Sequence, residues 1–132
     1  MAVSLRITAY ASLVALGAAC VALPAFATTA NIKALDPDND STVSLSEAQA
    51  AGAHKFTALD PDGDGTLDAK EAKIVLIDFS AADPDKDGTI DKAEYAAVIT
   101  AAFKAADPDG DGTVDAAEFA TPAGQRLLGL IQ

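Results

Sequence analysis

Apolar residues in this chain are concentrated in stretches that alternate with short polar segments. Three of these stretches are rich in Ala and free of proline, and they cover residues 48–59, 72–82 and 95–106. In the last one, Tyr95, Val98, Ala102 and Phe103 recur at the spacing of one helix face. The pattern predicts a helix in each stretch, including the apolar run KIVLIDF at residues 73–79.

Another apolar stretch, at residues 7–23, has a different character. It follows Arg6 and ends in an Ala-x-Ala sequence at residues 25–27, an order typical of a secretory signal peptide. A transmembrane anchor is the alternative, but polar residues interrupt the stretch. We expect cleavage after residue 27, so that residues 1–27 are a leader and residues 28–132 form a single periplasmic domain with no membrane attachment.

The one cysteine, Cys20, lies inside the predicted leader. The mature protein would therefore contain neither a disulfide nor a thiolate. A lipidated cysteine is the alternative, but Gly17-Ala18-Ala19 lacks the large aliphatic residue that usually stands three places before it.

The polar segments are four copies of one twelve-residue repeat. They are DPDNDSTVSLSE (36–47), DPDGDGTLDAKE (60–71), DPDKDGTIDKAE (83–94) and DPDGDGTVDAAE (107–118). The repeats contain 19 of the 20 acidic residues, all except Asp78. The net charge of −11 becomes −12 without the leader, because eight basic residues remain against 20 acidic ones. Such a charge disfavours nucleic acid and anionic membranes as partners and favours cations.

Each repeat carries the carboxylates of a calcium-type loop, with Asp at positions 1, 3 and 5 and Glu at position 12. Thr at position 7 would add its backbone carbonyl, and Gly at position 6 would allow the sharp turn. With the position-9 Asp of three loops, the predicted metal ligands are Asp36, Asp38, Asp40, Thr42, Glu47, Asp60, Asp62, Asp64, Thr66, Asp68, Glu71, Asp83, Asp85, Asp87, Thr89, Asp91, Glu94, Asp107, Asp109, Asp111, Thr113, Asp115 and Glu118.

Position 8 is apolar in every loop, where Val43, Leu67, Ile90 and Val114 stand. These residues are predicted to pack in the core. In paired EF-hand loops this position also meets its counterpart across a short strand contact, and both roles can hold.

Two features depart from an ordinary calcium loop. Proline at position 2 of all four loops either ends the preceding helix or stiffens the loop before metal binds. The Asp at position 9 either joins the metal site or caps the following helix. Five carboxylates leave three uncompensated charges around a divalent ion but two around a trivalent ion, so the composition favours a trivalent hard cation.

The first loop lacks two of these features. Ser41 replaces the Gly of position 6, and Ser44 replaces the Asp of position 9. The turn becomes harder to form and one carboxylate is lost, so the first site is predicted to be the weakest. The loops that begin at Asp60, Asp83 and Asp107 should bind tightly.

The repeated DPDxDGTxD, the leader and the ending TPAGQRLLGLIQ resemble the lanmodulins, the periplasmic lanthanide-binding EF-hand proteins of methylotrophic bacteria. The resemblance implies an all-α fold, a compact EF-hand-type bundle of about three helices, with the first loop packed against the fourth and the second against the third. Twelve residues make a helix of only about 18 Å, so one helix must serve two neighbouring loops.

The resemblance also implies selective, high-affinity binding of lanthanide(III) ions at up to four sites, for buffering, transport or sensing, and a periplasmic protein partner in lanthanide trafficking. The crowded acids predict folding on metal binding. The alternative is a Ca²⁺-binding EF-hand buffer or sensor, and the oligomeric state stays open. We do not expect an enzyme, because the mature chain has no cysteine, one histidine (His54) and no nucleophile motif.

Overall fold

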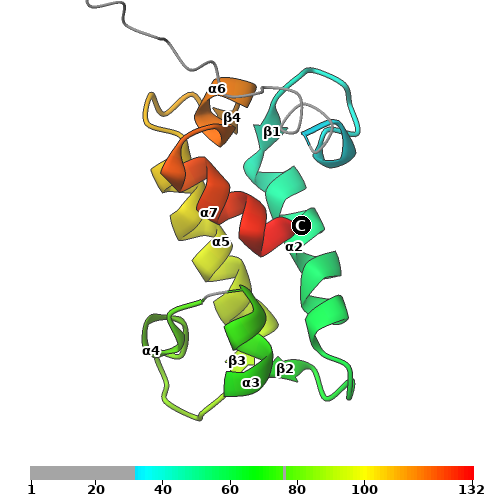
Figure 1. Ribbon diagram of the computed structural model, residues 1–132, viewed down its shortest axis with the longest axis vertical. Helices are drawn as coiled ribbons and strands as arrows, with labels where there is room; N and C mark the ends of the chain where they lie inside the picture. The colour runs from blue at the N-terminus through cyan, green and yellow to red at the C-terminus, as the bar shows by residue number, and fades with distance from the viewer. Residues whose placement is uncertain (1–31, 76) are drawn as a thin grey trace, which may run out of the picture.

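Three longer helices form the body of the molecule. The computed structural model describes residues 32–75 and 77–132, so the predicted leader and its cleavage site lie outside the described residues. The helices are α2 (Leu45–Leu59), α5 (Lys92–Ala106) and α7 (Pro122–Ile131). Helices α2 and α5 run side by side along the long axis, and α7 packs against both (Figure 1). This arrangement confirms the predicted all-α bundle of about three helices.

Short elements join these helices at both ends of the bundle. Residues 32–35 are helical. The remaining elements are β1 (Val43–Ser44), β2 (Thr66–Leu67), α3 (Ala69–Ala72), the 3-10 helix η1 (Lys73–Val75), α4 (Phe79–Ala82), β3 (Ile90–Asp91), β4 (Thr113–Val114) and α6 (Ala116–Phe119). No helix among the described residues is both long and apolar enough to cross a membrane.

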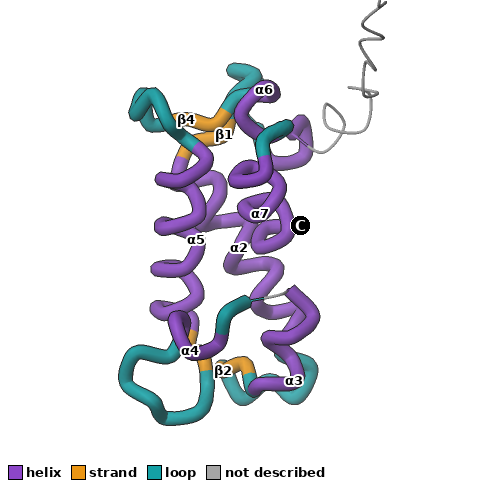
Figure 2. The backbone as a smooth tube through the Cα atoms, turned by 60° about the vertical axis from the view of Figure 1, so that its left-hand side comes forward, coloured by secondary structure: helices purple, strands orange, loops and turns teal. Residues whose placement is uncertain are grey.

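The strands form two antiparallel pairs, one at each end of the long helices (Figure 2). Strand β1 pairs with β4 so that Val43 faces Val114, and β2 pairs with β3 so that Leu67 faces Ile90. All four side chains are completely buried. The apolar residue of position 8 therefore has both predicted roles, and the predicted pairing of loop 1 with loop 4 and of loop 2 with loop 3 is confirmed.

Helices α2 and α5 begin and end at loop residues. Each begins with a capping box, Ser44 with Glu47 in α2 and Asp91 with Glu94 in α5, which satisfies backbone N–H groups of the first turn. Each ends at an Asp that precedes proline, a position where helical geometry is disfavoured. Helix α2 thus connects loop 1 to loop 2, and α5 connects loop 3 to loop 4, as the short spacing predicted.

The prediction of one helix over residues 72–82 was wrong. Helix α3 continues only as the 3-10 turn η1, and a new helix, α4, begins at Phe79. The β-branched residues Ile74, Val75 and Ile77 lose side-chain freedom in a helix, which weakens its continuation. Asp78 then starts α4, because its side chain accepts the Ser80 N–H. Ile74 is left 69% exposed.

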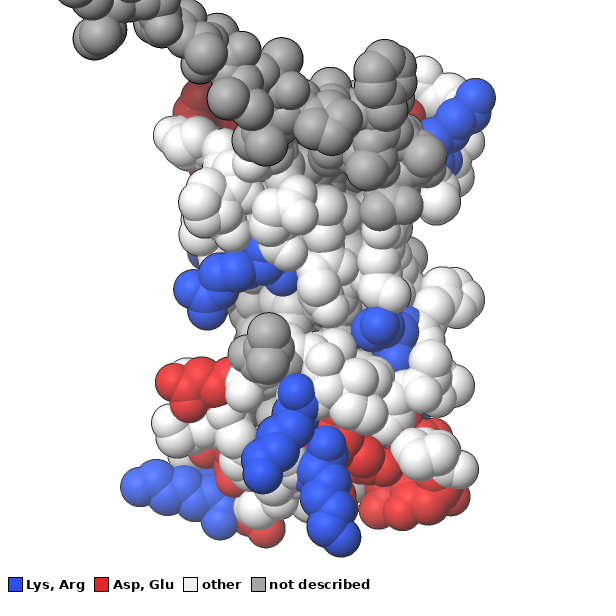
Figure 3. Space-filling view, in the orientation of Figure 1, with Lys and Arg blue, Asp and Glu red and all other residues white. Residues whose placement is uncertain are grey.

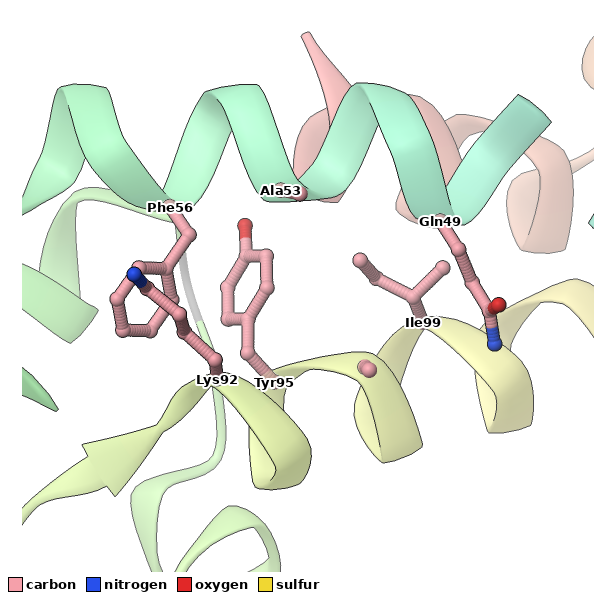
Figure 4. A pocket seen from close by; sticks show the side chains of 7 residues that line it. Gln49, Ala53, Phe56, Lys92, Tyr95 and Ile99 are labelled. Atoms are coloured by element: carbon pink, nitrogen blue, oxygen red, sulfur yellow. The ribbon is translucent and has the colours of Figure 1, made fainter. Parts of the chain in front are cut away.

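The core lies between α2, α5 and α7. The rings of Phe56 and Tyr95 meet edge to face at a centroid distance of 5.5 Å, and the Tyr95 hydroxyl donates to the Leu130 carbonyl of α7 at 2.7 Å. A cavity of about 60 Å³ opens between α2 and α5 beside these rings (Figure 4). Lys92 lies at its rim with Nζ 5.8 Å from the centre of the Phe56 ring, and no carboxylate lines it. The acidic chemistry of the chain therefore lies elsewhere.

Candidate metal centres

The four loops are tightly turned at two positions each. At position 6, Gly65, Gly88 and Gly112 have φ between 87° and 91°, and Ser41 adopts φ of 75°. Gly adopts this left-handed backbone easily, whereas Ser is strained in it. The structure therefore contains the strain at Ser41 on which the prediction of a weak first site rests.

Position 4 also has a positive φ, a requirement that the sequence analysis missed. Gly63 and Gly110 have φ of 72° and 73°, whereas Asn39 and Lys86 have φ of 60°. Gly and Asn are the residues that most readily adopt this conformation, and their presence at position 4 in three of four loops was the available signal.

Each loop gathers carboxylate oxygens around one point. Ligand oxygens of three residues per loop lie within 4.8 Å of one another. The groups are Asp36, Asp38 and Asp40 in loop 1, Asp60, Asp62 and Asp64 in loop 2, Asp83, Asp85 and Glu94 in loop 3, and Asp107, Asp109 and Glu118 in loop 4. The glutamate of position 12 thus belongs to the cluster in loops 3 and 4. In loops 1 and 2 the cluster is formed by positions 1, 3 and 5.

The Asp of position 1 is held by the backbone of its own loop. In loop 2, Asp60 Oδ1 accepts the Gly63 N–H at 2.8 Å and Oδ2 accepts the Gly65 N–H at 3.0 Å. In each of the other loops, Oδ1 of the position-1 Asp accepts the N–H three or four residues further on, and Oδ2 accepts the N–H five residues further on. Asp36 and Asp83 are also buried. A buried carboxylate needs such partners to remain charged. In the folded loop, position 1 is therefore held in place by hydrogen bonds as well as by any ion.

Crowding of carboxylates is most evident in loop 1. Burial raises the pKa of Asp36, but hydrogen bonds from the Ser41 backbone and its neighbours outweigh it and lower the pKa overall. The contact with Asp36 raises the pKa of Asp38, and burial and the charge of Asp40 add to this effect. The negative charges of the two carboxylates therefore repel each other, and a bound cation would relieve this repulsion.

The position-9 and position-12 residues form reciprocal caps. The Asp68 carboxylate accepts the N–H groups of Lys70 and Glu71, at 2.7 and 3.0 Å, and Glu71 Oε2 accepts the Asp68 N–H at 2.8 Å. The Glu71 and Lys70 N–H groups lower the pKa of Asp68. Asp115 caps α6 in the same way, and Asp91 forms a reciprocal cap on α5 in which it accepts the Glu94 N–H alone. The capping role that the sequence left open is present, and none of these three Asp belongs to a carboxylate cluster.

Thr at position 7 also contacts the carboxylate of position 5, which sequence reasoning missed. The hydroxyl and the N–H of Thr89 lower the pKa of Asp87, and the N–H and the hydroxyl of Thr113 lower that of Asp111. The repeated D-x-T at positions 5 to 7 was the signal. The predicted role of the Thr carbonyl as a ligand stays a prediction.

The donor set suits hard cations. Every clustered ligand is a carboxylate oxygen, the donor type that hard cations such as Ca²⁺ prefer. On the face seen in Figure 3, acidic side chains lie toward the two ends of the molecule, where the loops are. The residues present therefore fit a hard cation.

Comparison with known proteins supports this assignment. The family model described as an EF-hand domain pair matches residues 53–121, just over half of the chain. The match includes loops 2, 3 and 4 and leaves out loop 1, the one that departs most from the pattern. No curated protein matches the chain. With its paired, carboxylate-lined loops and this match, the chain belongs to the EF-hand family of metal-binding proteins.

Proposed function

We propose that this EF-hand protein selectively binds trivalent lanthanide ions in the periplasm, where it buffers, transports or senses them, and that it folds as they bind. The observation that carries the proposal is the amount of negative charge at each end of the molecule. Three loops have five carboxylates each, and strand pairing places the loops in two pairs. The resemblance of the repeats to the lanmodulins points to the same ions.

The charges of the paired loops can be counted. Loops 1 and 4 contain nine acidic residues and no Lys or Arg, so this pair has a charge of −9. Loops 2 and 3 contain ten acidic residues and Lys70, Lys86 and Lys92, which gives −7. Two divalent ions would leave −5 and −3, whereas two trivalent ions leave −3 and −1. Like charges in a small volume repel, so the trivalent ion removes more of the repulsion.

Proline at position 2 supports the proposal in a second way. Helices α2 and α5 end at the Asp before it, and the φ of proline is fixed. A loop that is already restricted loses less conformational entropy on binding. We infer that the loops are held in a shape that the trivalent ion closes more effectively than Ca²⁺ does.

Calcium binding is the second candidate, because the oxygen donors of the four clusters also suit Ca²⁺. A calcium sensor would expose an apolar groove to a partner, and Met is favoured at such grooves. Residues 28–132 contain no Met. A calcium buffer remains the closer rival.

A competitive titration separates the two candidates. Lanthanum is added to residues 28–132 in excess Ca²⁺, and helix content is followed by far-ultraviolet circular dichroism, with a chelator to reverse binding. We expect helix content to rise at lanthanum concentrations far below the Ca²⁺ concentration that gives the same change, because binding energy becomes folding energy. Equal midpoints for the two ions would overturn the lanthanide proposal and leave a calcium-binding protein. A spectrum that neither lanthanum nor chelator changes would overturn metal-induced folding.

A further inference from the structure

The Thr of position 7 makes the same pair of hydrogen bonds in all four loops. Its N–H and its hydroxyl both donate to Oδ1 of the Asp two residues earlier. In loop 3, Thr89 N and Oγ1 lie 2.8 and 2.7 Å from Asp87 Oδ1. The N–H distances in the other loops are 2.8, 2.8 and 2.9 Å, and the hydroxyl distances are 2.7, 2.8 and 2.8 Å, for Thr42 to Asp40, Thr66 to Asp64 and Thr113 to Asp111.

The geometry restricts the carboxylate of position 5. An ionised carboxylate only accepts hydrogen bonds, so the Thr hydroxyl must be the donor. Two donors on one oxygen hold the plane of the carboxylate, and the β-branched Thr side chain is itself stiff about χ1. Among the described residues, Oδ2 of these Asp accepts no hydrogen bond. The second oxygen therefore remains available as a ligand. Asp40 and Asp64 belong to the carboxylate clusters of loops 1 and 2, whereas the clusters of loops 3 and 4 contain the glutamate of position 12 in place of Asp87 and Asp111.

We propose that the hydroxyl of the position-7 Thr is a positioning group for metal binding, which fixes the position-5 carboxylate so that Oδ2 points to the ion. The inference rests on the proposed function, because it concerns the same four loops. Groups that orient a ligand without touching the metal typically change metal affinity by about tenfold to hundredfold when removed. The hydroxyl acts through the Asp, in addition to any role of the Thr carbonyl.

Thr could also stand at position 7 only because it stabilises the short strands, and the experiment must separate this strand role from the positioning role. Thr66 and Thr113 lie in strands β2 and β4, and Thr is a favourable strand residue. Val has the same branched shape and an equal or better strand preference, but it lacks the hydroxyl. Ser keeps the hydroxyl and is a poorer strand residue. A strand role therefore predicts that Val preserves binding and Ser weakens it, whereas a positioning role predicts the reverse.

The experiment compares two variants of residues 28–132. One has Thr42, Thr66, Thr89 and Thr113 changed to Val, and the other has the same four changed to Ser. Thr57→Val is the matched control, because its hydroxyl bonds the Ala53 carbonyl on α2 at 3.1 Å, away from the loops. Dissociation constants for lanthanum and for Ca²⁺ are measured against a competing chelator, and the rate of ion loss is measured after a chelator is added in excess.

We expect the Val variant to bind about tenfold to hundredfold more weakly per site and to lose the ion faster. The Ser variant and Thr57→Val should stay within about threefold of the unmodified protein, a difference below 1 kcal/mol. Val binding as tightly as Thr, or Val and Ser weakened equally, would overturn the inference. If the fourfold Val variant does not fold with saturating metal, the single pair Thr66→Val and Thr66→Ser gives the same comparison in loop 2, where Asp64 belongs to the carboxylate cluster.

Failure of the proposed function shows in a different measurement. Equal affinity of the unmodified protein for lanthanum and Ca²⁺ would remove lanthanide selectivity, while the difference between Val and Ser would still test the hydroxyl with either ion. An unmodified protein that binds neither ion would overturn both proposals.

Discussion

Replacing the position-9 Asp residues by Asn tests whether the fifth carboxylate contributes to selectivity. The change is Asp68→Asn, Asp91→Asn and Asp115→Asn together. Each of these residues caps a helix through its carboxylate, with N–H to O distances of 2.7 to 3.0 Å. Asn is as good an N-cap as Asp and keeps an oxygen that accepts the same N–H groups. The triple variant therefore removes three charges while the caps remain.

The size of the effect follows from the charge of the ion. None of the three carboxylates belongs to the clusters, so we place each charge about 5 Å from the ion, where a pair of unit charges interacts by about 1 to 3 kcal/mol at effective dielectric constants of 80 to 20. Losing one negative charge costs a trivalent ion three such interactions and a divalent ion two. The lanthanum-to-calcium affinity ratio should therefore fall by about fivefold to a hundredfold per altered site.

The assay is the ratio of lanthanum to Ca²⁺ midpoints for the helical transition. Loss of charge near a helix N-terminus also weakens the helix, by about 0.3 to 1 kcal/mol, but this cost is common to both ions and cancels in the ratio. Asp78→Asn is the matched control, because Asp78 caps α4 and is the one acid outside the loops. An unchanged ratio in the triple variant would refute the charge argument and leave position 9 with capping alone.

Three further changes test the fold and the loops. Ser41→Gly should stabilise the first loop by about 1 kcal/mol and tighten its site, because it relieves a φ of 75°; an unchanged affinity at that site in a metal titration would contradict this. Gly124→Ala should destabilise the protein in urea by about 1 to 3 kcal/mol, because the new Cβ would collide with the backbone carbonyl oxygen of Glu118. Gly129→Ala is the matched control, because its Cβ meets no atom within 4 Å, and it should stabilise α7 by up to about 1 kcal/mol. Tyr95→Phe leaves a buried carbonyl without its donor and should cost about 1 to 3 kcal/mol at neutral pH. Burial raises the pKa of Tyr95 from 10.0 to about 12, so the neutral hydroxyl stabilises the fold below pH 10 and this contribution is lost toward pH 12. Tyr95→Phe should therefore lose less stability than the unmodified protein between pH 10 and pH 12. Identical dependence of the free energy of unfolding on pH in the two proteins, measured in urea, would contradict this role of the hydroxyl.

Much of the architecture was predictable because the constraints are local. The Asp-Pro junctions end the helices, the carboxylates mark the loops, and the apolar position 8 selects the strand contacts. The pairing of loop 1 with loop 4 came from the family resemblance, since the spacing of repeats does not determine which loops meet. The helix predicted at residues 72–82 failed because apolar spacing says nothing of the weak helix preference of Ile74, Val75 and Ile77 or of the cap at Asp78.

The candidate site was predictable in composition and less so in geometry. A repeat states which residues are acidic, but not that Glu94 joins the cluster of its loop while Glu47 does not. The carboxylates of position 9 could have faced either the ion or the helix, because Asp suits both, and only the backbone direction decides. The Thr hydroxyls were missed since Thr at position 7 already had an expected role through its carbonyl.

The helix ends give a physical reason for the proposed coupling of folding and metal binding. Helices α2 and α5 begin beside Glu47 and Glu94, acids that suit the positive end of a helix, but they end at Asp60 and Asp107, acids at the negative end. Each helix has 15 residues, a length that is marginal alone in water. A cation at the terminal Asp reverses the unfavourable charge there, and one at the initial Glu fixes the opposite end. Each helix has a predicted ligand in both loop pairs, because α2 joins loop 1 to loop 2 and α5 joins loop 3 to loop 4. We therefore expect that two ions bound at one end of the bundle stabilise both helices, so that the other two ions bind to helices that have already formed.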